Sequence, residues 1–369
     1  MRRRFGDSAV KKPVVAVDAS PAARRAVTGT ELYAREVASR LPRLAPDIEW
    51  VFYSSRAAPD LGVDLTVMPF PRLWSQLRLP VELARAAPDL FFAPSHVVPF
   101  WCPAPALTVV HDLAFERFPD AYNSGQRRYL RLTTRWAERV CPELLAVSGS
   151  TRNDLVQLHR VDPARVTVVY PGGGELPVST AGAADEELRR LGIDEPFALQ
   201  VGRVEQRKNP LAALGAVERL PALLLVVAGQ VVDDGLAQRL RASPRCRVLG
   251  RVQPKVRELL YRRAAALIHP SLYEGFGFPV LEAMRSGLPV VTVRTSSLPE
   301  VAGEAALYVD DPTDVPALAE QLRRLLGDSE LREKLVEAGR RRAAQFTWDS
   351  CARGVLEVIR RRLAAPPAR

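Results

Sequence analysis

Short hydrophobic runs recur along the chain, and longer amphipathic segments separate them. Runs of this length, bounded by Gly, Pro and polar residues, are typical of buried parallel strands, and the segments between them have helical periodicity. The first run, residues 12–20 (KPVVAVDAS), precedes a glycine-containing loop and a predicted helix over residues 28–41. Further strands are expected in the first half of the chain at Glu49–Tyr53, Leu65–Met68, Leu90–Ala93, Leu107–Val110, Leu144–Val147 and Val166–Val169.

The second half of the chain repeats this alternation after a segment rich in Gly and Pro, residues 171–180 (PGGGELPVST), which is typical of a linker. Its strands are expected at Phe197–Val201, Ala222–Ala228, Cys246–Leu249, Ala265–His269, Pro289–Thr292 and Leu307–Val309. Strands that alternate with helices indicate parallel sheets covered on both faces. The pattern therefore predicts an α/β fold with two Rossmann-like, doubly wound domains, over residues 1–174 and 175–347.

Composition agrees with a soluble two-domain protein, because 369 residues with 47% hydrophobic and 25% charged content suffice for two cores. The uncharged stretch 90–110 has the length of a membrane span, but four prolines divide it into two short strands and a loop. The basic N-terminus leads into an apolar run too short for a signal peptide. The four cysteines have neither zinc nor disulfide spacing, so a cytoplasmic location is expected.

The formal net charge is +10, and arginine supplies most of it. An arginine-rich surface favours contact with phosphates, whether these belong to a nucleotide, a lipid head group or a nucleic acid. Composition does not choose among these ligands, and high Arg, Ala and Pro content also follows from a GC-rich genome.

The segment 271–292 (SLYEGFGFPVLEAMRSGLPVVT) brings acids, glycines and helix signals together. Glu274 precedes Gly275, Phe276 and Gly277, which suit a tight turn whose backbone amides face an anion, and a helix is expected from about Pro279. Glu282 then lies about one turn inside that helix. Two carboxylates around a glycine turn suit a ligand that carries both hydroxyls and phosphates.

This Glu-x7-Glu segment resembles the retaining GT-B glycosyltransferases of the GT4 type. The resemblance implies that Glu274 faces the transferred sugar, that Glu282 binds the ribose hydroxyls, and that the amides of Phe276 and Gly277 contact the phosphates. It also implies that the amphipathic segment 348–364 forms a helix that packs back on the first domain.

Two cations follow the first strand of the second domain in the run QVGRVEQRKNP. Arg203 can bind two phosphate oxygens and Lys208 adds a compact charge, so together they can neutralise a leaving nucleoside diphosphate. The run is similar to the donor-phosphate loop of the family, whereas Arg207 has no clear role. The resemblance further implies that backbone near Val252 touches the donor base, although the base itself is not identifiable.

In the first domain, His111 directly follows an apolar strand in the motif VVHDLAFERFPD. The motif is similar to one whose histidine lines the transfer site, so His111 is expected near the donor sugar; Asp112 either orients it or caps the next turn. Gly29 lies where a backbone could approach the ligand closely, and capping of the first helix explains it equally well.

Nothing in the sequence has the clustered Asp context of a metal-dependent transferase, so neither a metal nor a cofactor is expected. On the acceptor side, segment 125–140 predicts a helix with Arg128, Arg131, Arg135 and Arg139 along one side. This side either contacts an anionic membrane or a lipid-linked acceptor, or is simply solvated. Trp74, Arg78 and an LRLP turn beside them are similar to surface-polysaccharide mannosyltransferases.

The sequence thus predicts a metal-independent, retaining hexosyltransferase of polysaccharide biosynthesis, cytoplasmic or peripheral at the inner face of the membrane. It would move a sugar from a nucleotide diphosphate donor to a hydroxyl of a saccharide or lipid-linked acceptor, and no nucleic acid is expected as partner. Two alternatives stay open: a nucleotide-sugar epimerase or phosphorylase of similar architecture, and a basic protein that binds nucleic acid or a membrane surface.

Overall fold

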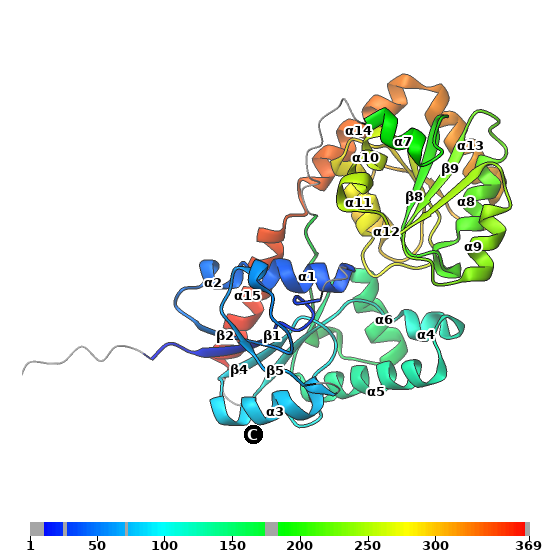
Figure 1. Cartoon of the computed structure of the whole chain (residues 1–369). Coiled ribbons are helices and arrows are strands. Elements are labelled where there is room, and N and C mark those ends of the chain that lie inside the picture. The colour runs from blue at the N-terminus through cyan, green and yellow to red at the C-terminus, as the bar shows by residue number, and fades with distance from the viewer. Residues whose placement is uncertain (1–10, 25–27, 71–72, 174–183, 366–369) are drawn as a thin grey trace, which may run out of the picture.

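The computed structural model describes residues 11–24, 28–70, 73–173 and 184–365. Within these residues the chain forms two lobes, each built on one parallel sheet covered by helices (Figure 1). The first lobe contains β1–β7 and the second contains β8–β13. The predicted α/β fold with two Rossmann-like, doubly wound sheets is therefore confirmed.

The first sheet has the strand order β3-β2-β1-β4-β5-β6-β7. Its strands are β1 (Val14–Asp18), β2 (Glu49–Ser54), β3 (Leu65–Val67), β4 (Leu90–Ala93), β5 (Ala106–Val110), β6 (Leu144–Ala146) and β7 (Val166–Val168). The helices of this part are α1 (Gly29–Ala38), α2 (Leu41–Leu44), α3 (Trp74–Ala86), α4 (Ala114–Arg117), α5 (Ser124–Val140) and α6 (Gly149–His159).

The second sheet has the order β10-β9-β8-β11-β12-β13. Its strands are β8 (Phe197–Val201), β9 (Leu224–Ala228), β10 (Cys246–Gly250), β11 (Ala266–His269), β12 (Val290–Val293) and β13 (Leu307–Val309). The remaining helices are α7 (Ala184–Arg190), α8 (Pro210–Val217), α9 (Asp234–Arg241), α10 (Pro254–Arg263), α11 (Phe278–Arg285), α12 (Leu298–Ala302), α13 (Val315–Gly327), α14 (Ser329–Ala343) and α15 (Trp348–Ala364).

Alternate residues of the central strands supply the two hydrophobic layers of the first lobe. Val15 and Val17 pack with α1 on one face, while Ala16 packs with α3 on the other. Phe91 and Phe92 divide in the same way between the two layers. Because both faces are covered, the strands are apolar throughout, which is why each one is recognisable in the sequence as an uninterrupted run.

Two predicted elements differ from the structure. The helix expected over residues 28–41 ends at Ala38, because Pro42 has no N–H to continue its hydrogen bonds and instead stands in the first turn of α2. The LRLP segment beside Trp74 is not a turn: residues 77–80 lie inside α3, where buried Leu79 and Pro80 pack against the sheet. Apolar burial there outweighs the helix-breaking tendency of Pro80.

The chain passes between the lobes twice, and the two crossings pack against each other. The predicted boundary at residues 174/175 lies outside the described residues, but the two residues that lead to it, Gly172 and Gly173, are described. Gly173 donates a backbone hydrogen bond to the carbonyl of Phe346 (3.1 Å), and a side chain at Gly172 would come within 2.2 Å of the Trp348 backbone nitrogen. Only glycine at position 172 permits this approach.

After the second crossing, α15 returns to the first lobe and packs beside α1 and α2 (Figure 1). The ring of Trp348 meets the ring of Tyr33 edge-on at 6.1 Å, and Asp349 accepts a hydrogen bond from Arg40 (2.9 Å). The last helix therefore belongs to the core of the first lobe although the sequence places it after the second.

Candidate active site

The strand order of the second sheet reverses beside β8, which lies between β9 and β11. Loops that leave the carboxyl ends of strands on the two sides of such a point diverge and leave a crevice, which is where open α/β sheets bind ligands. The loop after β8 carries Arg203 and Lys208, and the loop after β11 carries Glu274. The fold thus brings together two motifs that are far apart in the sequence.

Lys208 and Glu274 join the two loops directly. Lys208 Nζ lies 2.5 Å from Glu274 Oε1, and both side chains are buried. Burial alone would raise the pKa of Glu274, but Lys208, together with His269 and Arg207, holds that pKa well below its usual value. Glu274 is therefore an ionised carboxylate and a weak base.

Two residues of this cluster were missed by the sequence analysis. His269, at the end of β11, contacts Glu274 Oε1 through Nε2 (2.8 Å) and is completely buried. Arg207 lies 3.7 Å from Glu274 Oε2, donates to the carbonyl of Tyr273 (2.7 Å) and pairs with Glu205 (2.7 Å). A buried histidine at a strand end and a second cation in the β8 loop were the available signals, but neither is distinctive alone.

Arg203 lies at the outer side of the same loop. Its side chain is exposed and makes no hydrogen bond or ion pair with the residues that the structure describes. Arg203 and Arg207 are both near Tyr122, the residue before the N-cap of α5 in the first lobe, whose pKa burial raises to about 12. The guanidinium of Arg203 is thus available at the boundary between the lobes.

Glu282 lies in α11 and contacts α10. Its Oε2 accepts a hydrogen bond from the hydroxyl of Tyr261 (2.8 Å), and its Oε1 lies 3.5 Å from Arg257 Nη2. These partners fix the orientation of a buried carboxylate. Val252, in the loop before α10, is half-buried, and no hydrogen bond joins its backbone to the described residues.

The turn before α11 presents backbone amides rather than side chains. Gly277 has φ 108°, a conformation that glycine adopts readily and other residues rarely do, and it is the N-cap of α11. The amides of Gly275, Phe276 and Gly277 donate no hydrogen bond to the described part of the chain. Free amides at the positive end of a helix are suited to an anion.

His111 lies directly against this turn. A side chain at Gly275 would come within 2.1 Å of the His111 carbonyl oxygen, so the backbones of the two lobes touch there. Nε2 of His111 lies 2.9 Å from the carbonyl of Pro94, which can only accept, so Nε2 carries the proton and Nδ1 has the lone pair. Burial lowers the pKa of His111 to about 4, which keeps the ring neutral at pH 7.

Gly29 also lies at the boundary between the lobes, at the first position of α1. A Cβ added there would lie 2.8 Å from Cε2 of Phe278, the first residue of α11. Phe278 contacts Phe276 and Trp348 through its ring. In this structure the missing side chain of Gly29 leaves room for an aromatic ring of the second lobe.

Further polar contacts hold the lobes together beside the crevice. Tyr273 donates to Asp154 (2.7 Å) and accepts from the amide of Leu113 (3.0 Å). Glu300 accepts from the amides of Gly149 (2.7 Å) and Ser150 (2.6 Å) at the N-terminus of α6. A cavity of about 470 Å³ lies between these two contacts, and polar residues of both lobes line it.

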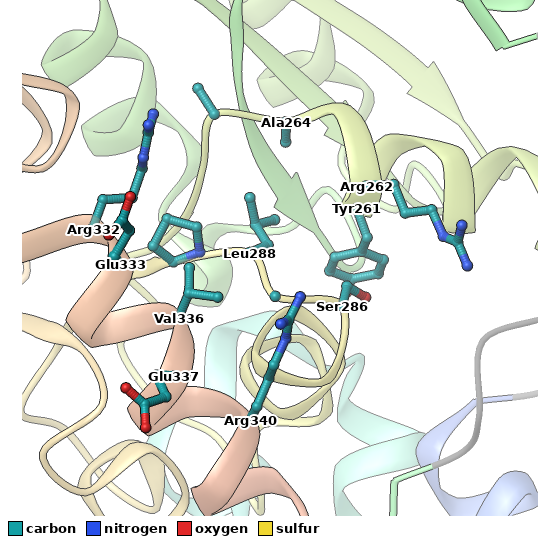
Figure 2. A pocket seen from close by; sticks show the side chains of 13 residues that line it. Tyr261, Arg262, Ala264, Ser286, Leu288, Arg332, Glu333, Val336, Glu337 and Arg340 are labelled. Atoms are coloured by element: carbon teal, nitrogen blue, oxygen red, sulfur yellow. The ribbon is translucent and has the colours of Figure 1, made fainter. Parts of the chain in front are cut away.

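A second hollow, of about 430 Å³, lies at the amino ends of β11 and β12 and thus at the opposite edge of the sheet (Figure 2). Tyr261, Leu288, Val336 and Arg340 are among its lining residues (Figure 2). None of the residues predicted to bind the donor lines it. None of them lines the cavity between the lobes either, so the candidate site is defined by the contacts of Lys208, Glu274 and the turn before α11.

No group of three or more His, Cys, Asp or Glu side chains among the described residues is arranged to hold a metal ion. No described helix combines the length and the apolar character needed to cross a bilayer.

Two lobes built on parallel sheets, with Lys208 and Glu274 paired between two loops of the second lobe and free amides at the N-terminus of α11, are the arrangement of a glycosyltransferase of the GT-B fold. Family models agree along most of the chain: residues 27–172 match Glycosyltransferase Family 4 and residues 184–342 match Glycosyl transferases group 1. The chain belongs to this family, the GT4-type glycosyltransferases that the Glu274–Glu282 segment resembles.

Curated relatives are consistent with this assignment. The chain is 32% identical over 258 residues to the O-antigen chain mannosyltransferase B of Escherichia coli, which covers 67% of this chain and 68% of that protein. It is 32% identical over 247 residues to the D-inositol 3-phosphate glycosyltransferase of Thermobifida fusca, covering 59% and 54% of the two chains. The second of these relatives is matched along only about half of its length.

Solved structures support the fold. Anabaena Alr3699/HepE in complex with UDP and glucose superposes with a TM-score of 0.75 at 17% identity, over 95% of this chain and 100% of that one. Sucrose-phosphate synthase from Thermosynechococcus elongatus has a TM-score of 0.74 at 21% identity, over 96% and 100%. The predicted family, fold and enzyme class are confirmed, which decides for a glycosyltransferase over a nucleic-acid-binding protein; the roles of individual residues stay predictions.

Proposed function

We propose that the protein transfers a hexosyl group from a nucleotide diphosphate sugar to a hydroxyl of a saccharide or lipid-linked acceptor, with retention at the anomeric carbon. The observation that carries this proposal is the cluster of Lys208, Arg207 and Glu274, beside which Gly275 lies against the His111 backbone of the other lobe. Burial lowers the pKa of Lys208, and the carboxylate of Glu274 opposes that shift. A cation in a water-poor site stabilises a departing diphosphate more strongly than it would in water.

The donor would lie along the carboxyl edge of the second sheet. Its ribose hydroxyls would bind Glu282, whose carboxylate Tyr261 holds in place, and its base would contact the backbone near Val252. Its diphosphate would meet Arg203, Lys208 and the free amides of Phe276 and Gly277. The sugar would then reach Glu274 and His111.

Transfer breaks the bond between the anomeric carbon and the diphosphate oxygen, and the bonding electrons leave with the diphosphate. The acceptor hydroxyl oxygen forms the new bond to that carbon and gives up its proton. Glu274 is a weak base because of its lowered pKa, and so is His111 with a pKa of about 4. The departing diphosphate oxygen is the remaining base. It lies on the face of the sugar ring from which it departs, so the acceptor hydroxyl that gives it a proton attacks from the same face. Attack from that face gives retention.

We propose that this reaction needs no metal ion. In many phosphate sites a divalent cation neutralises the leaving group, whereas here Arg203, Lys208 and the N-terminus of α11 would neutralise it. A cytoplasmic location, peripheral at the inner face of a membrane for a lipid-linked acceptor, agrees with four free cysteines.

The experiment is transfer by the purified protein, with a panel of nucleotide sugars and saccharide or polyprenyl-linked acceptors. Release of nucleoside diphosphate that depends on acceptor, and a product whose anomeric configuration by NMR equals that of the donor, are expected. Inverted product would overturn the retaining mechanism, and isomerised donor without acceptor would indicate an epimerase.

A further inference from the structure

The first lobe exposes an unusual number of large apolar side chains on one side. The most exposed are Leu73 (59%), Leu77 (54%), Trp101 (56%) and Leu132 (57%), and Phe70, Val81, Phe100 and Tyr129 accompany them. They belong to α3 with its preceding residues, to the loop between β4 and β5, and to α5. We call this set the apolar face.

Hydrogen bonds join these three segments into one surface. Gln76 of α3 accepts from the amide of Phe100 (2.9 Å), and Trp136 of α5 donates to the carbonyl of Pro99 (2.9 Å). The rings of Phe100 and Trp136 meet edge-on at 5.8 Å. Figure 1 shows α3 and α5 at the end of the first lobe that points away from the second lobe. The apolar side chains are therefore neighbours, although the sequence spreads them over 63 positions (from Phe70 to Leu132, counting both).

Arginines lie among these apolar residues. Arg128, Arg135 and Arg139 follow the exposed side of α5 with Leu132, and none of the three forms a hydrogen bond or ion pair with the described residues through its side chain. Arg131, the fourth arginine predicted on this side, is instead paired with Glu116 (2.6 Å). The exposed side of α5 thus has three available positive charges.

Little negative charge lies in the same segments. The helices α3 and α5 contain one acidic residue each, Glu82 and Glu138, and the loop between β4 and β5 has none. Glu82 pairs with Arg78 (2.8 Å), and Glu138 contacts His159 (2.5 Å). The face therefore combines exposed apolar side chains with a net positive charge.

We propose that the apolar face docks the protein on an anionic lipid bilayer. Leucine, tryptophan and tyrosine side chains enter the boundary between head groups and acyl chains, and arginines beside them bind the head-group phosphates. A nucleic acid would bind the arginines, but it would not bury the exposed side chains of the apolar face, namely Leu73, Leu77, Trp101 and Leu132. The combination of both on one surface favours a bilayer.

The loop between β4 and β5 links this face to the transfer site. Pro94, where the loop begins, accepts the hydrogen bond of His111, and Trp101 lies on the apolar face seven residues later. One loop thus reaches from the candidate site to the bilayer. A lipid-linked acceptor held in that bilayer could present its hydroxyl to the crevice, a consequence that rests on the proposed function, whereas the docking itself does not.

Sedimentation of the whole protein with vesicles tests the proposal without either substrate. The protein should bind vesicles in which about a third of the lipids are anionic and bind neutral phosphatidylcholine vesicles far more weakly. The triple variant Arg128→Ser, Arg135→Ser, Arg139→Ser should partition about a hundredfold less. The double variant Trp101→Ser, Leu132→Ser should lose at least about tenfold.

Matched controls come from the second lobe. Arg239→Ser, Arg241→Ser, Arg324→Ser removes the same charge from exposed positions, and Val232→Ser shortens an exposed apolar side chain. These controls should bind vesicles like the unchanged protein, and every variant should keep its activity toward a water-soluble acceptor. No binding to anionic vesicles, or equal loss in the two arginine triples, would overturn the docking face. Binding that survives Trp101→Ser, Leu132→Ser would show a purely electrostatic contact and would also contradict it.

Discussion

Lys208 and Glu274 form a buried ion pair between two loops of the second lobe, with 2.5 Å between Nζ and Oε1. Removing one member of such a pair leaves the other as a buried charge without its main partner. Loss of either partner should therefore destabilise the lobe, and in the proposed mechanism Lys208 also supplies positive charge to the diphosphate.

Lys208→Ala should lower turnover by at least about a hundredfold, because the departing diphosphate loses a cation. It should also lower the free energy of unfolding by about 3 kcal/mol, since Glu274 stays charged and buried. Lys334→Ala, which removes an exposed lysine paired with Glu330, is the control. A double variant, Lys208→Met with Glu274→Gln, should recover much of the stability but none of the turnover. Near-normal turnover in Lys208→Ala would remove this lysine from the mechanism.

Glu282→Ala should weaken donor binding, because the ribose loses its carboxylate partner. The discriminating measurement compares affinities for a nucleoside diphosphate and its deoxyribose analogue by calorimetry. The unchanged protein should prefer the ribose form by about tenfold or more, and Glu282→Ala should lose that preference. Tyr261→Phe keeps the carboxylate but removes a bond that orients it, so a smaller loss is expected. An unchanged ribose preference in Glu282→Ala would contradict the role.

Gly275→Ala should reduce turnover strongly while nucleoside diphosphate binding to the second lobe is kept. A methyl group at this position would lie 2.1 Å from the backbone carbonyl of His111, and backbone cannot give way as a flexible side chain can. The lobes would therefore close incompletely. Gly327→Ala is the matched control, because nothing lies within 4 Å of its added Cβ. Equal turnover in the two variants would show that the contact is not needed for transfer.

Two buried groups should give opposite contributions to stability in mild acid. Burial lowers the pKa of His111 to about 4, so its contribution is complete above pH 6.5 and is lost as pH falls toward 4. Burial raises the pKa of Asp18, at the end of β1, to about 6, so the folded state takes up a proton below pH 6 and gains stability as pH falls. Between pH 6 and 5 the two contributions, each about 1 kcal/mol, oppose each other.

Denaturant unfolding at pH 6 and pH 5 separates these contributions. Asp18→Asn should lose about 1 kcal/mol more than the unchanged protein over this interval, and His111→Asn should lose correspondingly less. The same change in both variants would contradict the assigned pKa directions. Turnover should show no ionisation of His111 above pH 5.

Chelation tests the proposal that cationic side chains replace a metal. Turnover in excess EDTA should equal turnover in its absence, since Arg203, Lys208 and the N-terminus of α11 supply the positive charge. Loss of activity that magnesium restores would refute the metal-independent mechanism.

The sequence predicted the strands well and the site only in part. Buried parallel strands such as Leu90–Ala93 are apolar on both faces, so each one is a distinct local signal. Partners such as Lys208 and Glu274 are 66 positions apart, and the sequence suggested a shared ligand for them but not a direct ion pair. That pair depends on which strands the sheet places side by side.

The residues missed in the crevice have the same physical explanation. His269 is a common residue at the end of a common strand, and only its complete burial against Glu274 makes it distinctive. Arg207 is directly beside Lys208 in the sequence, but its contact with the carbonyl of Tyr273 requires the β8 and β11 loops to be adjacent. For Gly29 the sequence identified the residue but not its contact. The side chain that lies against it, Phe278, comes from the other lobe.

The central claim is that one nucleotide sugar donor binds the cations and carboxylates of the second lobe. Thermal unfolding with UDP, GDP, dTDP, ADP and their sugars tests it most directly, because a ligand that binds the folded state raises the melting temperature. At least one of these nucleotides should raise it in the unchanged protein, and the rise should nearly disappear in both Lys208→Ala and Glu282→Ala. No rise with any of them, or a rise that both variants keep in full, would contradict the account.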